Sequence, residues 1–359
     1  MFRKLDWWLL VPIAALLLVG VAMLYSLAGS NTQNLSWMYR QLVWVVIGAG
    51  VMLFTALIDY RAFRASAALV WFLYIGIWLL LALVLVFGKT ISGNKAWFAI
   101  GPFTLQPVEF AKIALVLILA RYFSEKNLEI WRMKHIVISC LITMGITGLV
   151  LLQPDMGSAL LLATVWFCML LASGVRVKHV LALGFIFCIL VVAGWFWFFT
   201  ENQKSRISAL VFPTKDPLGA AYSQRQALIA LGSGGLFGKG LGKGTQTQLG
   251  FLPAPRTDFI FSAIGEELGF VGIAIISICF GVLFWRLGWF ALAAENNFVR
   301  LYAVGLMGVL FAQAAVHIAM NLGLIPVIGV GLPFVSYGGS SILALFWGFG
   351  MMQSMRLHG

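Results

Sequence analysis

Residues 66–87 read SAALVWFLYIGIWLLLALVLVF, an apolar run of 22 residues that contains no charged side chain. As an α-helix this run is about 33 Å long, enough to cross the roughly 30 Å hydrocarbon core of a bilayer. Its apolar residues are continuous and do not alternate with period two, which excludes a strand of an outer-membrane barrel. The run is therefore predicted to be a transmembrane helix.

Similar runs recur along the rest of the chain. The 359 residues are 62% hydrophobic and 10% charged, whereas soluble globular chains have about 25% charged residues. We predict an all-α polytopic membrane protein with about ten transmembrane helices. It forms one domain over 1–359, with an extracytoplasmic loop at about 200–257. The runs lie near 7–28, 41–58, 66–87, 105–123, 135–152, 157–174, 179–199, 259–290, 299–322 and 333–355.

The net charge of +12 comes from short clusters between the runs. No basic face with interleaved aromatic residues is present, which excludes a nucleic-acid partner. The positive-inside rule places both termini in the cytoplasm, with the first run retained as a helix. The short outer loops then carry only Arg40, Lys89 and Lys95, and the inner loops carry Arg3, Lys4, Arg61, Arg64, Arg121, Lys126, Arg132, Lys134, Arg176, Lys178, Arg286, Arg300 and Arg356.

The remaining polar residues concentrate on the predicted outer side, which indicates an extracytoplasmic site. Apolar residues of the long loop could also lie along the bilayer surface as an amphipathic segment. These residues are Leu218, Tyr222, Leu228, Ile229, Leu231 and Leu236.

Glu109 and Lys112 form the first candidate constellation, because residues three apart share a helix face. A charge at the bilayer centre costs about 2.5 to 3.5 kcal/mol on insertion scales, which favours mutual pairing. One interpretation is a salt bridge that fixes helix packing. The other is that Lys112 faces an anionic substrate group while Glu109 orients it.

For two further features, a structural role is at least as well supported by the sequence as a functional one. Asp155 follows Pro154 and is predicted to cap the next helix. The glycine-rich run 232–244 contains Lys239 and Lys243, but lacks the Ser or Thr and the preceding strand of a nucleotide-binding loop. It is either a flexible turn or a site for another anion, whose oxygens backbone N–H groups would bind.

Asp258 precedes the long run 259–290 and is either a helix N-cap or a general base at the membrane boundary. Glu266 and Glu267, two turns deeper, are predicted to be structural. The serines of 336–341 have no His and acid placed to make one a nucleophile. His317, alone on an apolar face, is predicted to be a packed polar residue and not a metal ligand.

Seven segments, in order along the chain, strongly resemble the SEDS family of FtsW, RodA and SpoVE. The resemblance covers nearly the whole chain, and the short termini with Leu5, Asp6 and Trp7 resemble the RodA branch more than FtsW. The segments are GPFTLQPVEFAK (101–112), QPDMGSA (153–159), DPLGAAY (216–222), GSGG (232–235), GTQ (244–246), TDFIFSAIGEELG (257–269) and SYGGSS (336–341).

The resemblance implies an inverting peptidoglycan glycosyltransferase of the bacterial inner membrane, active during cell elongation. Such an enzyme polymerises lipid II and works with a class B penicillin-binding protein and with other elongation proteins such as MreC and MreD. No tightly bound cofactor or metal is expected, although a divalent cation could help neutralise pyrophosphate. The resemblance implies that Asp258 is the general base, and the predicted substrate-binding residues are Lys112, Glu109, Arg206, Gln106, Gln226, Lys239, Arg256 and Ser336.

The chain departs from the family pattern at several positions. Ala254 and Arg256 stand where Glu and His are usual, Ala227 where Ser is frequent, and His317 where Asn is frequent. Two alternative functions stay open: a flippase for lipid II, and a non-catalytic scaffold for the penicillin-binding protein. Charged residues clustered on the outer side favour the polymerase, because a flippase needs them along a path through the bilayer.

Overall fold

The computed structural model describes residues 5–29, 35–91, 93–101, 103–126, 133–197, 201–211 and 220–359. Within these residues each predicted run contains one long helix, which confirms the all-α polytopic membrane fold. Helices α1, α2, α4, α6, α12 and α13 are long and apolar enough to span a membrane unaided, and Met156–Ala172 and Val177–Ile186 are shorter apolar segments. The long helices are α1 (Trp7–Ser26), α2 (Leu35–Leu57), α4 (Ala67–Phe87), α5 (Pro107–Glu125), α6 (Met133–Leu152), α7 (Met156–Ala172), α8 (Val177–Trp197), α12 (Ile260–Ala293), α13 (Asn297–Asn321) and α14 (Gly339–Leu357).

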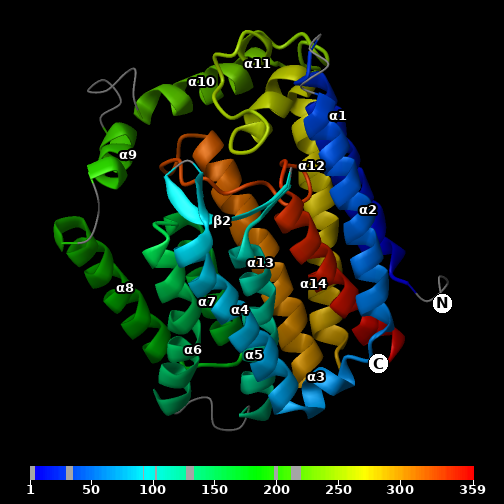
Figure 1. The fold of residues 1–359 in the computed structure, drawn as a ribbon, viewed down its shortest axis with the longest axis vertical. Coiled ribbons are helices and arrows are strands. Elements are labelled where there is room, and N and C mark those ends of the chain that lie inside the picture. The colour runs from blue at the N-terminus through cyan, green and yellow to red at the C-terminus, as the bar shows by residue number, and fades with distance from the viewer. Residues whose placement is uncertain are drawn as a thin grey trace.

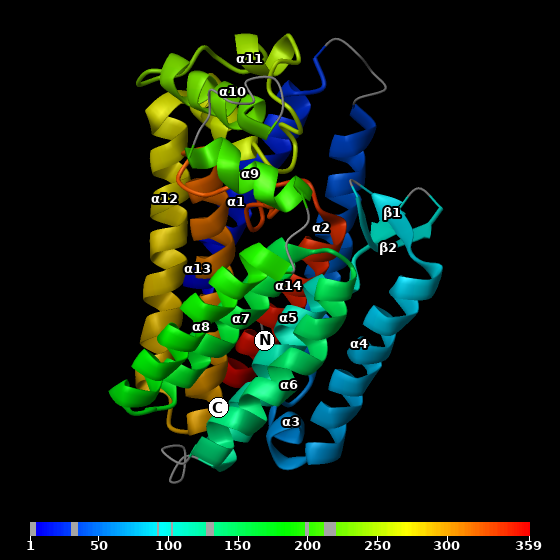
Figure 2. The same ribbon diagram turned by 90° about the vertical axis from the view of Figure 1, so that its left-hand side faces the viewer.

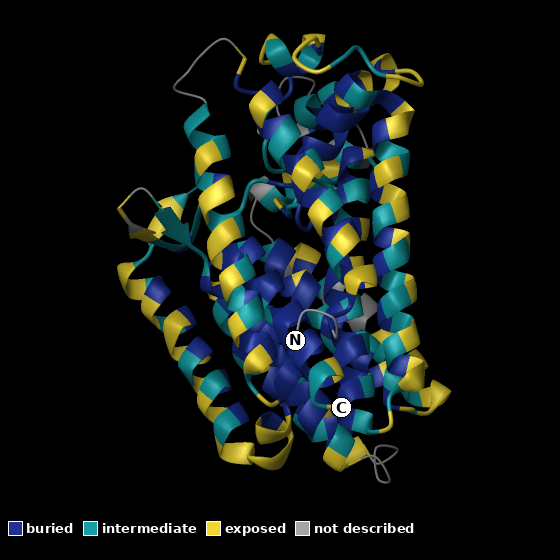
Figure 3. Cartoon of the chain, turned by 90° about the vertical axis from the view of Figure 1, so that its right-hand side faces the viewer, coloured by how far each residue is buried: buried dark blue, intermediate teal, exposed yellow. Residues whose placement is uncertain are grey.

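The most polar long helices lie inside the bundle. Most residues of α5 and α14 are buried, and α14 packs against α2 and α5 while α13 packs against α5, α7 and α12. Figure 3 shows the buried residues concentrated in the interior. Peripheral helices instead expose large apolar side chains such as Phe72 of α4 and Phe185 of α8. These side chains suit a lipid environment, so burial within the bundle shields the charges of α5 from lipid.

A small antiparallel sheet, which the sequence did not predict, precedes α5. Its strands are β1 (Lys89–Ile91), β2 (Asn94–Ile100) and β3 (Phe103–Leu105), in the order β1-β2-β3. Strands this short carry too little alternation to be recognised from sequence. Strand β2 contacts α4 and α5, and β3 contacts α14, as Figure 2 shows near one end of α4. The sheet thereby sets the path of the chain into α5.

The predicted loop 200–257 contains α9 (Glu201–Val211), α10 (Ala220–Ser233) and α11 (Thr245–Gln248). These helices lie across one end of the bundle, here called the loop end, whereas the short helix α3 (Arg61–Ala65) lies at the opposite end (Figure 1). Helix α10 packs against α9, α12 and α13. Leu218, part of the predicted amphipathic segment, lies outside the described residues.

Four of the long helices begin at a polar side chain that caps the helix. Asp6 caps α1, Ser66 caps α4, Asp155 caps α7 and Asn296 caps α13, each accepting a hydrogen bond from a backbone N–H of the first turn. The predicted cap at Asp155 is therefore confirmed. Helices α5, α12 and α14 begin without a side-chain cap, and in α12 the N-cap residue, Phe259, has no hydrogen-bonding side chain.

Helix α12 is interrupted at Gly269, whose φ of 68° and ψ of −160° are not helical. The glycine-rich loop supplies hydrogen-bond acceptors at this break: Phe270 N donates to Gly235 O at 3.0 Å, and Val271 N donates to Leu236 O at 3.1 Å. A Cβ at residue 269 would collide with Gly238 N. Glycine at 269 is therefore required both by its backbone angles and by the close approach of the loop.

Candidate functional site

The glycine-rich loop and helix α11 together bind an anion that belongs to the protein itself. Glu266 accepts hydrogen bonds from Lys239 Nζ (2.9 Å), Thr245 Oγ1 (3.2 Å), Gln246 N (2.8 Å) and Thr247 N (3.0 Å). Its carboxylate is fully buried. Lys239, a predicted substrate ligand, is therefore held in an ion pair with a buried acid.

Glu267 is also fully buried and is held by a second set of donors. It accepts from Gly242 N (3.2 Å), Thr247 Oγ1 (3.0 Å), Gln248 Nε2 (2.9 Å) and Ser26 Oγ of α1. We call Glu266 and Glu267 the glutamate pair. With their hydrogen-bonding capacity used inside the fold, both residues agree with the predicted structural role.

Asp258 lies in the segment 251–259 that leads into α12. Three backbone carbonyls of this segment accept hydrogen bonds from residues outside it. Arg256 O accepts from Tyr337 N (2.9 Å), and Thr257 O accepts from Ser336 Oγ (2.8 Å). Asp258 O accepts from Asn321 Nδ2 (2.9 Å). The main chain around Asp258 is thus anchored to the end of α13 and to the segment that precedes α14.

The carboxylate of Asp258 is half-buried. It accepts a hydrogen bond from the Thr257 side chain and lies in the field of Arg206. Within the described residues it does not cap α12, so the alternative of Asp258 as an N-cap is wrong. Burial raises the pKa of Asp258, and the Thr257 hydrogen bond and the Arg206 charge oppose that rise. A raised pKa makes the ionised carboxylate a stronger base.

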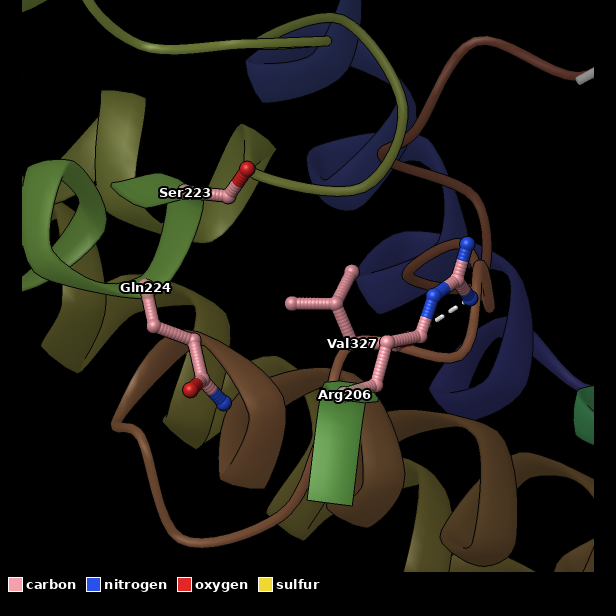
Figure 4. Close-up of a pocket in the computed structure, with 4 residues that line it drawn as sticks. All are labelled: Arg206, Ser223, Gln224 and Val327. Atoms are coloured by element: carbon pink, nitrogen blue, oxygen red, sulfur yellow. Dashed lines mark hydrogen bonds between the residues drawn. The ribbon is translucent and has the colours of Figure 1, made fainter. Parts of the chain in front are cut away.

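Arg206 of α9 is exposed, and its Nη1 donates to Val327 O at 2.9 Å. It lines a pocket of about 180 Å³ together with Ser223 and Gln224 of α10 and Val327 of the segment after α13. In Figure 4 the guanidinium extends past Val327, while Ser223 and Gln224 project from α10 on the other side. Gln224 Nε2 donates to Ile325 O at 2.6 Å, which fixes α10 on that segment. Because Arg206 bonds a neutral carbonyl, much of its charge is available to an anion.

A second polar cluster lies at the start of α5 and α7. Lys112 Nζ is 2.8 Å from Glu109 Oε2, and the two side chains are 2% and 12% exposed. Gln106 Nε2 donates to Asp155 Oδ2 at 3.2 Å. Burial raises the pKa of Asp155, hydrogen bonds from Ser158 lower it, and the nearby charges of Glu109 and Lys112 act in opposite directions. Lys112 therefore pairs directly with Glu109, and its charge also acts on the nearby Asp155.

The segment 332–341 joins the two polar regions. Near its start Ser336 holds the Asp258 segment, and near its end Ser340 Oγ accepts from Gln106 N at 2.9 Å. Gln41 of α2, almost fully buried, donates to Ser336 O at 3.2 Å and accepts from Gly338 N at 3.3 Å. Ser336 is thus a positioning residue for the main chain, in agreement with the prediction that it is no nucleophile.

Arg256 and Gln226 are the two remaining predicted ligands. Arg256 stacks on Trp37 at 5.5 Å from the ring centroid, and its Nη2 lies 3.5 Å from Leu27 O. Gln226 lies half-buried on α10, two residues beyond Gln224 of the pocket.

Sequence analysis did not identify three amides of the site: Gln41, Gln224 and Asn321. Gln41 and Asn321 stand at the ends of apolar runs, and such isolated amides are the signal that could have found them.

Residues 6–358 match the model of the FtsW/RodA/SpoVE family, described as "Cell cycle protein". Among curated proteins, the chain is similar to peptidoglycan glycosyltransferase MrdB of Escherichia coli K12, with 37% identity covering 99% of this chain and 94% of that protein. It is also similar to stage V sporulation protein E of Bacillus subtilis, with 35% identity covering 98% and 96%.

Two solved structures share the fold over 98% of this chain, each at 32% sequence identity. One belongs to a study of the structural coordination of polymerization and crosslinking by a peptidoglycan synthase complex, with a TM-score of 0.83 and 98% of that chain covered. The other is the Rod shape determining protein RodA of Thermus thermophilus, with a TM-score of 0.72 and 97% of that chain covered.

Proposed function

The chain belongs to the FtsW/RodA/SpoVE family and is a peptidoglycan glycosyltransferase, and we propose that it polymerises lipid II with Asp258 as the general base. In this reaction the 4-hydroxyl of an acceptor sugar attacks the anomeric carbon of a donor sugar that is α-linked to undecaprenyl pyrophosphate. The new bond is β-1,4, pyrophosphate leaves with the C–O bonding electrons, and the hydroxyl proton passes to the base. Such a reaction needs one base and positive charge at the leaving group.

The observation that carries this proposal is the state of the Asp258 carboxylate. It is half-buried, is not used to cap α12 and lies in the field of Arg206. A carboxylate beside a cation suits a base that works next to a departing anion. A hydrogen bond to Thr257 orients it, and its raised pKa improves proton acceptance.

The proposal assigns the pyrophosphate chiefly to Arg206. Of the four predicted cations, Lys239 is paired with Glu266, Lys112 with Glu109, and Arg256 lies on Trp37. Arg206 lines the pocket and bonds a carbonyl. Lys112 has a second, weaker part in this assignment, because Glu109 offsets its charge.

The proposed setting is the bacterial inner membrane, with both termini cytoplasmic and the loop end outside. The distribution of cations between short loops supports this orientation. The proposed partners are a class B penicillin-binding protein and the elongation proteins MreC and MreD. The synthase complex among the similar structures supports a crosslinking partner. A cysteine introduced in place of the exposed Phe237 should react with an impermeant thiol reagent added from outside; protection from that reagent would reverse the orientation.

The test of the base compares wild type with Asp258→Asn in purified protein supplied with labelled lipid II. The asparagine keeps the size of the side chain but cannot accept the proton, so glycan formation should fall at least about 100-fold. Asp59→Asn is the matched control, because Asp59 is exposed at the opposite end of the bundle, where its carboxylate accepts a hydrogen bond from Arg61 N. Equal activity of wild type and Asp258→Asn would remove Asp258 from the mechanism.

A further inference from the structure

Helix α12 begins next to the proposed base and yet lacks a capping side chain of its own. Its N-cap residue is Phe259, so Ser262 occupies position N3. The N–H of N3 has no partner inside a helix and is ordinarily bound by the side chain of the N-cap residue. In this helix the bond comes from another helix, because Ser262 N donates to Asn321 Oδ1 at 3.1 Å.

Asn321 is the last residue of α13 and is fully buried. Its Oδ1 accepts from both Ser262 N (3.1 Å) and Ser262 Oγ (2.7 Å), and its Nδ2 donates to Asp258 O (2.9 Å) and His317 O (2.8 Å). All the hydrogen-bonding capacity of the amide is used. The reversed amide would place N–H groups against Ser262 N–H and its oxygen against two carbonyls, so the partners define one orientation.

This single side chain therefore connects the first turn of α12 with the main chain of Asp258. An aspartate just before a helix is favoured as a cap, because the N-terminal amides and the helix dipole stabilise its charge. The same interactions would lower its proton affinity. With the Asn321 oxygen on Ser262 N, the carboxylate of Asp258 is not required there.

We propose that Asn321 is a positioning residue for the base, capping α12 from α13 and leaving the carboxylate of Asp258 free to accept the proton of the acceptor hydroxyl. This inference rests on the proposed function of Asp258. A neutral amide suits the role, because it supplies both the acceptor for α12 and the donor for Asp258 O without adding a charge. Aspartate at 321 would supply the acceptor only.

Because charged groups surround Asp258, the positioning role of Asn321 can be tested by the pH dependence of kcat. Arg206 of α9 is the cation whose field reaches the carboxylate. Arg256 precedes it on the same segment, where Tyr337 N binds the Arg256 carbonyl. On α13, His317 is buried one turn from Asn321, and its Nδ1 binds Val330 O at 2.8 Å. Removing the cap should lower the pKa of Asp258, whereas adding a negative charge at 321 should raise it.

The experiment measures kcat, KM for lipid II and the pH dependence of kcat for Asn321→Ala and Asn321→Asp. Asn321→Ala leaves Ser262 N without a partner, and the Asp258 carboxylate can turn to bind it. We expect kcat to fall about 10- to 100-fold with KM changed less than about threefold, and the acid limb to move to lower pH. Asn321→Asp keeps the cap but adds a negative charge, so its acid limb should move to higher pH.

Asn296→Ala is the matched control, because Asn296 caps the other end of α13 through Val299 N at 3.0 Å. Its kcat should stay within about twofold of wild type, while its melting temperature should fall as for Asn321→Ala. An equal loss of kcat in Asn296→Ala and Asn321→Ala, or an acid limb unmoved in both 321 variants, overturns the proposal. Asn321→Asp keeps both Ser262 bonds while it loses the bonds to Asp258 O and His317 O, so its pH profile tests the role separately from Asn321→Ala.

The experiments also distinguish a failure of the positioning role of Asn321 from a failure of the proposed base. Loss of activity in Asp258→Asn with normal kcat and pH profile in both 321 variants rejects only the positioning role. Full activity in Asp258→Asn rejects the base and this inference with it. In the Asp258→Asn background, Asn321→Ala should reduce kcat by less than about twofold further, because no base remains to be positioned.

Discussion

The glutamate pair and Asp258 are carboxylates on one short stretch of chain, yet the fold treats them differently. Glu266 and Glu267 are fully buried, and each accepts hydrogen bonds from four groups, which come from the glycine-rich loop, from α11 and, for Glu267, also from Ser26 of α1. Asp258 is half-buried, and its helix is capped by Asn321. A carboxylate that accepts hydrogen bonds only from inside the fold stabilises the structure. A carboxylate that does not have to cap its helix can accept a proton from a substrate.

The strongest test of this comparison removes a member of the glutamate pair. Glu267→Ala removes the acceptor of the buried Ser26 Oγ, and one of the two acceptors of Gly242 N, Thr247 Oγ1 and Gln248 Nε2. Because unsatisfied buried donors are costly, the free energy of unfolding should fall by about 3 kcal/mol. Thermal unfolding in detergent measures this loss, and Glu267→Gln, which keeps one acceptor oxygen, should lose less. Unchanged stability with abolished glycan synthesis would make Glu267 a functional acid.

The second test removes the cation beside Asp258. Arg206→Ala should lower kcat/KM for lipid II by about 10- to 100-fold, which corresponds to the 1.5–3 kcal/mol of a charged hydrogen bond. Its melting temperature should change little, because Arg206 is exposed. Arg225→Ala on α10, also exposed, is the control and should stay within about twofold. Comparable losses in both variants would show that general positive charge, and not the Arg206 position, binds the substrate.

The smallest expected effect is in the pH dependence. A base must be ionised, so activity falls as pH drops through the pKa of Asp258, which burial raises above 3.8. The charge of Arg206 favours the ionised form. In the residual activity of Arg206→Ala the acid limb should therefore lie at higher pH than in wild type. A limb displaced to lower pH contradicts this account of the Asp258–Arg206 interaction.

The sequence predicted the spanning helices well because each requires a long local apolar run. It also identified Asp155 as a helix cap, where the local order Pro154, Asp155, Met156 was sufficient. It did not predict the sheet at 89–105, whose strands are too short to show a period. The anion site of the glycine-rich loop was recognised as one possibility, but not its occupant, because Glu266 is 27 positions from Lys239.

By itself, then, the sequence determined a helical membrane protein with polar segments between its spans, because twenty apolar residues in succession are compatible with few other structures. The family motifs also directed attention to Asp258. Only the tertiary structure decided which acid is free, because the deciding donors and acceptors come from distant segments. Ser26 is 241 positions from Glu267, and Asn321 is 63 positions from Asp258. Hydrogen bonds act over about 3 Å in space, whatever the separation along the chain.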